Sequence, residues 1–458
     1  MTRPPWLAPA VTGVVVWLVV ALAPLTPAAA ALRAGAASVT VEVPAGTPLA
    51  GYGTLARRLW LPDVLGRHPH AFWFRPSTGT RDPVVARALV LESGRARLAW
   101  VTVDLVAVDA AFTRDAAARL VSSGARPLTL MVSASHTHSG PGAFIDSAVM
   151  GWLTLDRADS AVRDALLKAV VTAVRQADAA AAPATMAVAS VTAPPVVRSR
   201  FARRLDHEVI VLKIATPAGA PVAVVWNFAI HNTMLSASNL QLSGDVTGAA
   251  SAVLERELGA PALFVNGAVG DVSPARHGAA AMGEVGKALA ATVQQGWRTA
   301  VAVGGDRMEI RTKRVMFAPP RLSVRHCVDG WAPRFLTIPL GDTFPRAADL
   351  LGISVGGLAW VGVPGELQTA LGEAIKREGR ALFGRAFVAG LSNDYLGYFV
   401  TAADYDRPHY VTCAAVFGRH AGDCLAEAAV GLLHSLRGRA RPEPAGGAPS
   451  ACEAAAAR

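Results

Sequence analysis

Apolar runs of strand length alternate along the chain with longer stretches of helical periodicity. In residues 159–179, Val162, Leu166 and Val170 recur four positions apart and therefore lie on one face of a helix. Further helices are predicted at 246–258, with Gly259 as a C-cap, and at 365–377 and 423–436. Strands are predicted at 96–103, 127–133, 209–214, 221–228, 263–266, 353–363 and 386–391.

This alternation predicts an α/β fold in which mixed β-sheets are flanked by helices in a single large domain. Of the 458 residues, 52% are hydrophobic and 17% are charged, so a large buried core is expected and global disorder is excluded. We expect the domain to span residues 32–437. The tail at 438–458, rich in Ala, Pro and Gly, is expected to be disordered.

The first 31 residues have the pattern of an export signal. Arg3 precedes an apolar run over 6–25, and the small residues 28–31 offer a cleavage site. The run is also long enough for an uncleaved membrane anchor, although Pro24 interrupts it near its end. We therefore expect an exported protein, secreted or periplasmic, that stays anchored only if this segment is retained.

The formal net charge of +10 is spread along the chain. No basic block with interleaved aromatic residues is visible, so nucleic acid is not an expected partner. A basic surface favours peripheral contact with anionic membranes, while a simple compositional bias toward Arg remains the alternative. The sequence does not indicate an oligomeric state.

Two histidines follow one of the predicted strands. Residues 135–142 read SHTHSGPG and come directly after the apolar run at 127–133. In an extended segment, residues two apart point to the same side, so His136 and His138 could face one centre. The glycines at 140 and 142 allow a sharp turn and a close approach of the backbone to a ligand. A polar loop with two solvated histidines is the open alternative.

Other polar residues follow other apolar strands in the same way. They are His231 after 221–228, Asp271 and Ser273 after 263–266, Glu366 after 358–363, and Tyr398 after 386–391. Each alone has a simpler interpretation: a structural histidine, a turn cap, a carboxylate at a helix N-terminus, and a half-buried tyrosine.

Together these positions predict a metal site. In open α/β sheets, ligands bind beyond the carboxyl ends of the strands. Two histidines and one carboxylate are a common ligand set for catalytic zinc, with one position left open for water.

Several short motifs, in this order, resemble the catalytic domain of the neutral/alkaline (non-lysosomal) ceramidases. The matching segments are GYG at 51–53, HTHSGPG at 136–142, NFAIH at 227–231, SGDVTG at 243–248, GDVSP at 270–274, PGE at 364–366 and GLSNDYLGY at 390–398. The resemblance runs from about residue 34 to about residue 436. It implies a zinc-dependent hydrolase that cleaves the amide of ceramide, a lipid substrate, to sphingosine and a fatty acid.

The resemblance also implies roles for individual residues. One zinc ion per chain would be held by His136, His231, Glu366 and Tyr398. The residues expected near the scissile amide are His138, Ser273, Arg198 and Tyr410. Arg198 is assigned because Val197-Arg198-Ser199 stands where the family has an Arg-Ser pair in a loop on the substrate side.

The sequence departs from the family at three points. It ends soon after the last expected helix, so no counterpart of the family's C-terminal immunoglobulin-like domain is expected. Asn232 follows His231 where a proline is usual, and several loops look shortened. The alternatives are therefore a hydrolase of another N-acyl or ester substrate at the same zinc site, or a non-catalytic exported lipid-binding protein. A serine hydrolase is the weaker enzymatic alternative, because Ser273 does not lie in a G-x-S-x-G motif.

The four cysteines, Cys327, Cys413, Cys424 and Cys452, contain no CxxC pair. A cysteine-based zinc site is therefore not expected. Export permits disulfides. Cys413 and Cys424 form a candidate pair because both lie in the segment after the candidate tyrosines, and the partners of the other two stay open.

Overall fold

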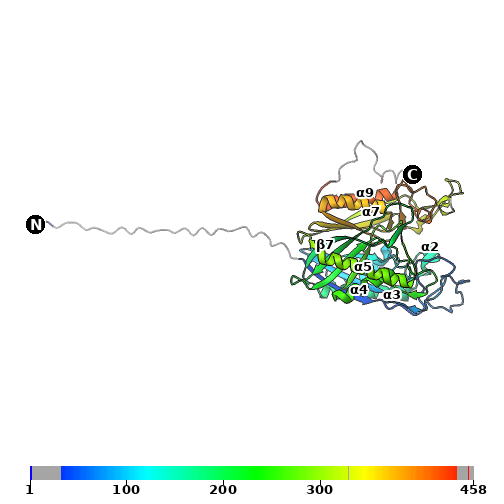
Figure 1. The fold of residues 1–458 in the computed structure, drawn as a ribbon, viewed down its shortest axis with the longest axis horizontal. Helices are drawn as coiled ribbons and strands as arrows, with labels where there is room; N and C mark the ends of the chain where they lie inside the picture. The colour runs from blue at the N-terminus through cyan, green and yellow to red at the C-terminus, as the bar shows by residue number, and fades with distance from the viewer. Residues whose placement is uncertain (3–31, 329, 441–451, 453–458) are drawn as a thin grey trace, which may run out of the picture.

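The computed structural model describes residues 1–2, 32–328, 330–440 and 452 (Figure 1). Residues 3–31 of the expected leader and most of the expected tail from 438 lie outside this part of the chain. No helix within the described ranges combines the length and apolarity needed to cross a bilayer.

Three sheets form the body of the molecule. The first has the order β5 (Thr129–Ala134), β4 (Ala96–Val103), β3 (Val85–Ser93), β1 (Arg33–Thr40), β6 (Ala182–Pro183). The second has the order β12 (Ala262–Asn266), β10 (Pro221–Phe228), β9 (Glu208–Ala215), β7 (Thr185–Thr192), β14 (Val301–Ala302). The third has the order β15 (Met308–Met316), β18 (Ala347–Val355), β19 (Leu358–Gly362), β21 (Arg385–Ala389). In each sheet one edge pair is parallel: β4 with β5, β10 with β12, and β19 with β21.

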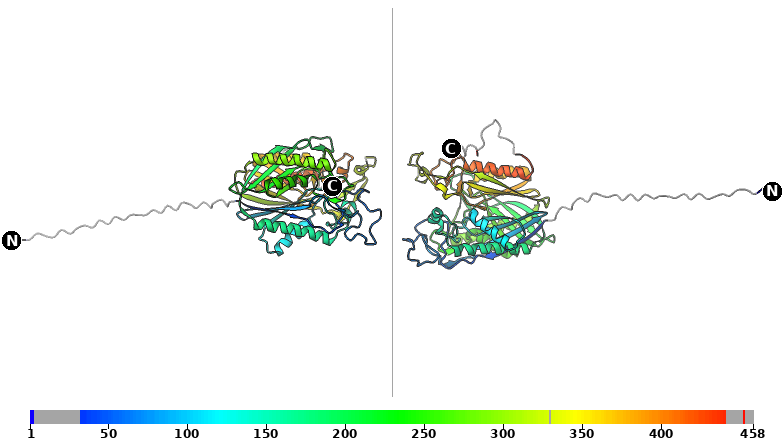
Figure 2. Two further views of the ribbon diagram at one scale, coloured as in Figure 1. Left: turned by 60° about the horizontal axis from the view of Figure 1, so that its bottom comes forward. Right: turned by 180° about the vertical axis from the view of Figure 1, so that it is seen from behind.

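Helices cover the outer faces of the sheets (Figures 1 and 2). On one side lie α1 (Ala110–Ser122), α3 (Ser160–Ala179), α4 (Asp245–Leu258) and α5 (Ala279–Thr299), and on the other α7 (Thr369–Phe383) and α9 (Ala421–Leu436). The expected α/β class with mixed sheets is confirmed. Gly259 ends α4 at φ 65°, a left-handed conformation that glycine adopts without steric cost.

Short elements connect these layers and build their edges. They are β2 (Gly79–Thr80), β8 (Val197–Ser199), β11 (Gln241–Leu242), β13 (Val272–Pro274), β16 (Arg321–Ser323), β17 (Thr337–Pro339), β20 (Glu366–Leu367), β22 (Tyr398–Phe399), α2 (Ala148–Met150), α6 (Val324–Cys327) and α8 (Tyr410–Cys413).

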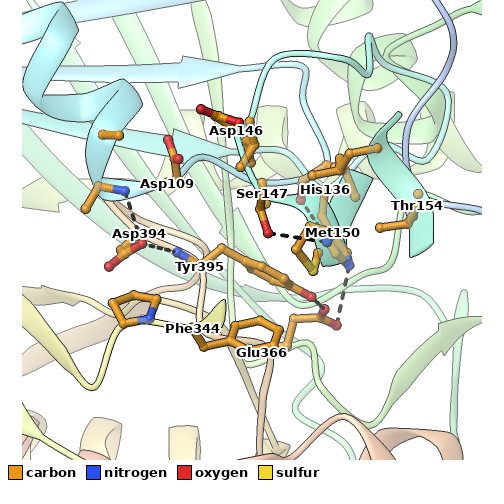
Figure 3. A pocket seen from close by; sticks show the side chains of 18 of the residues that line it. Asp109, His136, Asp146, Ser147, Met150, Thr154, Phe344, Glu366, Asp394 and Tyr395 are labelled. Carbon is orange, nitrogen blue, oxygen red and sulfur yellow. Dashed lines mark hydrogen bonds and ion pairs between the residues drawn. The ribbon is translucent and has the colours of Figure 1, made fainter. Parts of the chain in front are cut away.

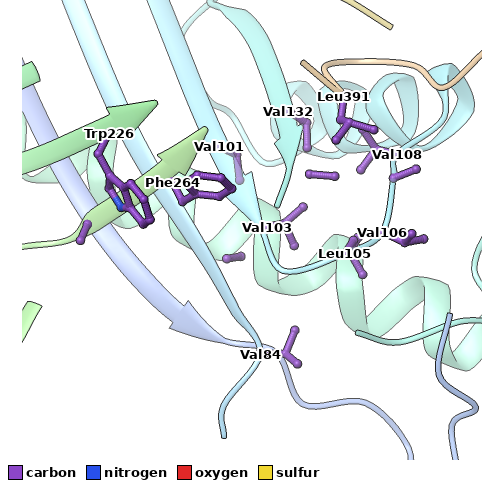
Figure 4. Packing of buried hydrophobic residues seen from close by; sticks show 14 of the residues in the cluster. Val84, Val101, Val103, Leu105, Val106, Val108, Val132, Trp226, Phe264 and Leu391 are labelled. Carbon is purple, nitrogen blue, oxygen red and sulfur yellow. The ribbon is translucent and has the colours of Figure 1, made fainter. Parts of the chain in front are cut away.

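The inner faces of all three sheets share one apolar core. In β9, Ile210 and Leu212 point into this core, while Val209 and Val211 point to the core beneath the helices. This alternation is the period of two that a strand buried on both faces requires. Trp226, Phe264 and Val101 belong to the core beneath the helices (Figure 4). The shared core contains a stack of Trp100, Trp360 and Phe387, with ring centroids 5.2 to 6.2 Å apart. The stack joins the first sheet to the third.

The side chain of Asn227 joins the second sheet to the third. Its Nδ2 donates to the carbonyl oxygens of Val265, at 3.0 Å, and of Val388, at 2.9 Å. Because β10 ends at Phe228 and β21 at Ala389, this contact aligns the carboxyl ends of two strands from different sheets. A buried amide held in this way costs stability if it is lost, because its carbonyl partners lose a donor.

Two predicted elements have different bounds in the structure. The single strand expected at 353–363 is wrong, because Gly356 and Gly357 turn the chain between β18 and β19. Gly356 has φ +53°, and a Cβ there would lie 2.5 Å from the carbonyl oxygen of Val303. The helix expected from 365 begins only at Thr369, so Glu366 lies in β20 and not in the first turn of α7.

The candidate disulfide between Cys413 and Cys424 is also wrong. Cys413 in α8 pairs with Cys327 in α6, and Cys424 in α9 pairs with Cys452. The two cysteines are close in sequence, but α8 packs on α6 while Cys424 is buried in the core beneath α9.

The Asn227 contact makes a testable prediction for stability. We expect Asn227→Ala to lower the free energy of unfolding by about 1–3 kcal/mol, the cost of leaving buried carbonyls without their donor. Gln295→Ala, at an exposed position of α5, is the control and should change it by less than about 0.5 kcal/mol. Denaturant unfolding measures both, and equal values for the two variants would contradict the role of Asn227.

Candidate metal centre

The carboxyl ends of strands from all three sheets meet at one place. His136 follows β5, His231 follows β10 and Glu366 follows β19. All three side chains are buried, with 2%, 1% and 1% of their residue surface exposed. The arrangement predicted from the strand ends is therefore present in the structure, although it is built by three sheets and not by one.

The backbone and ring of His136 are fixed by two carbonyl groups. The residue has φ 69°, which is strained for a residue with a Cβ. Its N–H donates to the carbonyl oxygen of Leu105 at 2.9 Å, and its Nδ1 lies 2.6 Å from that of Val106. Because Nδ1 must donate to this carbonyl, the Nε2 lone pair is free to bind a metal, a common second contact of metal-binding histidines.

Three potential ligand atoms converge within a small space. His136 Nε2 lies 3.1 Å from His231 Nε2, and Glu366 Oε2 lies 3.0 Å from His231 Nε2 and 3.4 Å from His136 Nε2. Zn–N bonds of about 2.05 Å in a tetrahedral site would place such atoms about 3.3 Å apart. Glu366 Oε2 has no hydrogen-bond partner of good geometry within the described chain. The donor set therefore fits a divalent metal ion.

The protonation states also suit a metal. Burial lowers the pKa of His231 to about 3, and the charges of Arg200 and His136 act in the same direction. Burial acts to raise the pKa of Glu366, but its close contacts with the two histidines outweigh it and hold that pKa well below its ordinary value. At neutral pH the site therefore offers a neutral imidazole at His231 and an ionised carboxylate, the forms that bind a metal.

Two tyrosines lie beside Glu366 on the segment that follows β21. Tyr395 Oη donates to Glu366 Oε1 at 2.7 Å, so the other carboxylate oxygen, Oε2, is the one that faces the histidines (Figure 3). Tyr398, the expected fourth ligand, accepts a hydrogen bond from Arg200 Nη1 at 3.4 Å. Sequence reasoning missed Tyr395, although it stands three residues before Tyr398 in the motif at 390–398.

His138 is the third histidine of the cluster. One ligand atom from each of His136, His138 and His231 lies within 4.8 Å of the others, so the three could hold a metal ion together. Neither ring nitrogen of His138 has a hydrogen-bond partner within the described residues. Its ring contacts Tyr52 edge to face at 4.9 Å, and a Cβ at Gly51 would lie 2.5 Å from it. Burial, followed by the charges of the other two histidines, lowers its pKa well below the ordinary value.

Arg200, two residues after the expected Arg198, lies beside these side chains. Arg198 itself is exposed, and its expected role near the scissile amide stays a prediction. Strand β8 ends at Ser199 and the chain bends, so the next residue points inward. Arg200 Nε donates to Ser273 Oγ at 2.9 Å, and Nη1 donates to the carbonyl oxygen of Gly270 at 3.1 Å. The Val-Arg-Ser motif could not show which arginine lies past the bend.

The other expected residues lie around the same centre. Ser273 is buried on β13, paired with β8. Tyr410 begins α8 with half of its surface exposed, and its ring stands 6.3 Å from that of Tyr398. Asp271 has the simpler role considered for it: its Oδ1 accepts hydrogen bonds from the N–H and hydroxyl of Thr369, where α7 begins.

A cavity of about 460 Å³ leads to this centre, within the usual range for small-molecule sites (Figure 3). Its floor carries His136, His138 and Glu366. Its walls combine apolar side chains with a few carboxylates and hydroxyls: Val106, Ile145, Met150, Leu155, Phe344, Asp109, Asp146, Asp394, Ser147 and Thr154. A ligand with a long apolar part and a polar end would match this lining.

The chain is similar in sequence to a known protein family and to several of its members. The model of the family described as "Neutral/alkaline non-lysosomal ceramidase, N-terminal" matches residues 73–318. Neutral ceramidase B of Dictyostelium discoideum is 22% identical over 417 residues, which cover 64% of this chain and 58% of that protein. Neutral ceramidase of Mycobacterium tuberculosis is 29% identical over 173 residues, 31% of this chain and 26% of that protein. The chain thus spans about three fifths of the Dictyostelium relatives it matches.

The fold also matches a solved structure. The crystal structure of neutral ceramidase from Pseudomonas aeruginosa aligns with a TM-score of 0.76 and 19% sequence identity, covering 92% of this chain and 77% of that one. At this identity the match establishes the fold.

The contact between Tyr395 and Glu366 makes a testable prediction for metal affinity. We expect Tyr395→Phe to weaken metal binding about 10- to 100-fold, because the carboxylate loses the hydrogen bond that orients it. His231→Ala, which removes a ligand atom, should abolish metal retention. Competition with a chromophoric chelator measures both.

Tyr405→Phe is the matched control, because the Tyr405 ring packs on His326 away from the centre. Its metal affinity should equal that of the unchanged protein. Wild-type affinity in Tyr395→Phe would show that Tyr395 does not position the carboxylate.

Proposed function

The chain belongs to the neutral/alkaline non-lysosomal ceramidase family, and from this we propose that it is a zinc-dependent amidohydrolase of ceramide or a related N-acyl lipid. The products are a free amine, sphingosine in the case of ceramide, and a fatty acid. The observation that carries the proposal is the convergence of His136 Nε2, His231 Nε2 and Glu366 Oε2 within 3.0 to 3.4 Å, beside a partly apolar cavity that His136 and Glu366 line.

One zinc ion per chain would be held by His136, His231 and Glu366, with Tyr398 as the fourth residue. When bound, it supplies a Lewis acid that polarises the carbonyl and makes water a better nucleophile near neutral pH. Tyr395 keeps the Glu366 carboxylate in position from the opposite side.

The reaction adds one water across the amide. The water oxygen bonds to the acyl carbon, the C–N bond breaks, and a proton passes to the leaving nitrogen. His138 is suited to carry this proton: its ring nitrogens are buried without partners, and its lowered pKa keeps it neutral and able to accept.

The negative charge that develops on the carbonyl oxygen during the reaction is stabilised by a hydrogen-bond donor. Arg200 would supply one, because its guanidinium donates to Ser273 Oγ and Tyr398 Oη and lies over the ring of Tyr410. In this proposal Tyr410 adds a hydroxyl from the cavity wall, and Ser273 hydrogen-bonds a hydroxyl or the amide of the substrate.

We place the protein outside the cytosol, secreted or periplasmic. Its four cysteines form two disulfides, which persist in oxidising compartments. The apolar segment within residues 1–31 would direct export and would anchor the chain only if it is not removed.

The first prediction concerns metal and substrate together. The purified protein should contain one zinc per chain and release fatty acid from a fluorescent N-acylsphingosine. A chelator should remove this turnover and added zinc should restore it. Bound zinc without turnover on any N-acyl amide or ester would favour the non-catalytic lipid-binding alternative, and turnover on other N-acyl compounds alone would change the substrate class.

The second prediction separates the two arginines of the β8 segment. Arg200→Ala should lower kcat/KM about 10²- to 10³-fold, as expected for loss of an oxyanion donor. Arg198→Ala is the matched control, two residues away and exposed, and should stay within about threefold. The zinc content of both variants should equal that of the wild type. A larger loss in Arg198→Ala would reverse the assignment.

A further inference from the structure

Three segments of the chain expose large apolar side chains to solvent. Residues 55–65 expose Leu55, Leu61 and Leu65 together with Trp60, which is fully accessible at 101%. Trp152 and Leu153 form the second segment, at 53% and 43% exposure. Residues 331–338 form the third, with Trp331 at 80% and Phe335 at 85%. We call these segments the apolar rim. Exposed aromatic clusters of this kind are rare on soluble proteins without an interaction partner.

The rim segments lie close in the sequence to residues that line the cavity. Each segment adjoins residues that line it: Gly51 before the first, Met150 and Thr154 on either side of the second, and Phe344 after the third. The loop that carries the first segment and the loop that carries the third project at the same end of the molecule in every view (Figures 1 and 2).

The first two segments are bonded to each other and to the site. Arg58 Nε donates to the carbonyl oxygen of Gly53 at 3.0 Å, and its Nη2 donates to that of Trp152. Arg57 Nη2 donates to the carbonyl oxygen of His138 at 3.1 Å. These two segments of the rim are therefore attached to the part of the chain that lines the cavity.

The charge of the rim is basic. Arg58 and Arg334 lie among its exposed apolar residues, whereas its one acidic residue, Asp63, is buried and pairs with Arg67. The whole chain carries a formal charge of +10. Tryptophan, leucine and arginine together are the composition that lies at a membrane–water interface, where rings sit at the headgroups and cations meet anionic lipid.

We propose that the apolar rim docks onto the surface of an anionic lipid bilayer and opens the cavity directly to the membrane. This deepens the proposed function, on which it rests: a substrate with a long acyl chain would pass from bilayer to cavity without crossing water. A second copy of this chain on the rim would instead cover the mouth. The bilayer is the occupant that leaves the route to the metal centre open.

The test uses the full mature chain and vesicles without substrate. Flotation with equimolar phosphatidylcholine and phosphatidylglycerol should carry the wild-type protein, and vesicles of phosphatidylcholine alone should bind it at least about tenfold less. The double variant with Trp60→Ser and Phe335→Ser should bind the anionic vesicles at least about tenfold more weakly. Neither residue lines the cavity.

The matched control removes exposed apolar residues elsewhere. Val121 lies in the last turn of α1, at the opposite end of the helix from Ala110, which lines the cavity. Val301 lies on the edge strand β14. Their exposures, 73% and 60%, are comparable to those of the rim. Val121→Ser with Val301→Ser should bind vesicles as the wild type does, and equal losses in both double variants would overturn the proposal.

Two further readouts separate this proposal from the proposed function. The rim variant should keep wild-type turnover of a soluble short-chain N-acyl substrate and lose at least about tenfold on vesicle-borne substrate, because only delivery is impaired. If no substrate is turned over, the proposed function is contradicted. Vesicle binding still tests whether the rim docks onto a bilayer, because it is measured without substrate. Absence of vesicle binding, or self-association in light scattering that the rim variant abolishes, would overturn the bilayer as the occupant.

Discussion

One apolar core shared by three sheets determines where His136, His231 and Glu366 of the candidate metal centre lie. The stack of Trp100, Trp360 and Phe387 fixes the distance between the first and third sheets, and the amide of Asn227 fixes the second against the third. Protein interiors are close-packed and deform little, so the ends of these strands are held with the precision of the core. The centre needs that precision, because a shift of about 1 Å in one ligand would disrupt its geometry.

The strained backbone of His136 shows how this rigidity is used. A left-handed conformation in a residue with a Cβ costs about 1–3 kcal/mol and persists only where the surroundings impose it. Here the carbonyl oxygens of Leu105 and Val106, which follow strand β4, hold the backbone and the ring. The strain turns the imidazole toward His231 and Glu366. The packing of the sheets therefore fixes the position of His136 Nε2.

Local patterns in the sequence predicted the strands, and the ends of the strands predicted most of the centre. The bounds 96–103 and 221–228 agree with β4 and β10 to the residue, because runs of buried side chains fall between polar turns. What local patterns missed, Arg200 and the disulfide partners, depended on backbone direction or on distant contacts. Arg198 and Arg200 differ only by a bend after Ser199, and no short motif encodes a bend. The disulfide partners depend on helix packing, which spacing along the chain does not report.

The disulfide between Cys327 and Cys413 joins two parts of the chain 86 residues apart, next to Tyr410 on one side and the segment at 331–338 on the other. Closing a loop of this size removes about 4–5 kcal/mol of chain entropy from the unfolded ensemble. The helix that carries Cys413 is also bonded to the candidate metal centre, because the backbone N–H of Tyr398 donates to the carbonyl oxygen of Ala414, and Tyr398 pairs with Glu366. Reduction of this disulfide would therefore loosen the outer wall and the tyrosine beside Glu366 together, while His136 and His231 stay held at the ends of their own sheets.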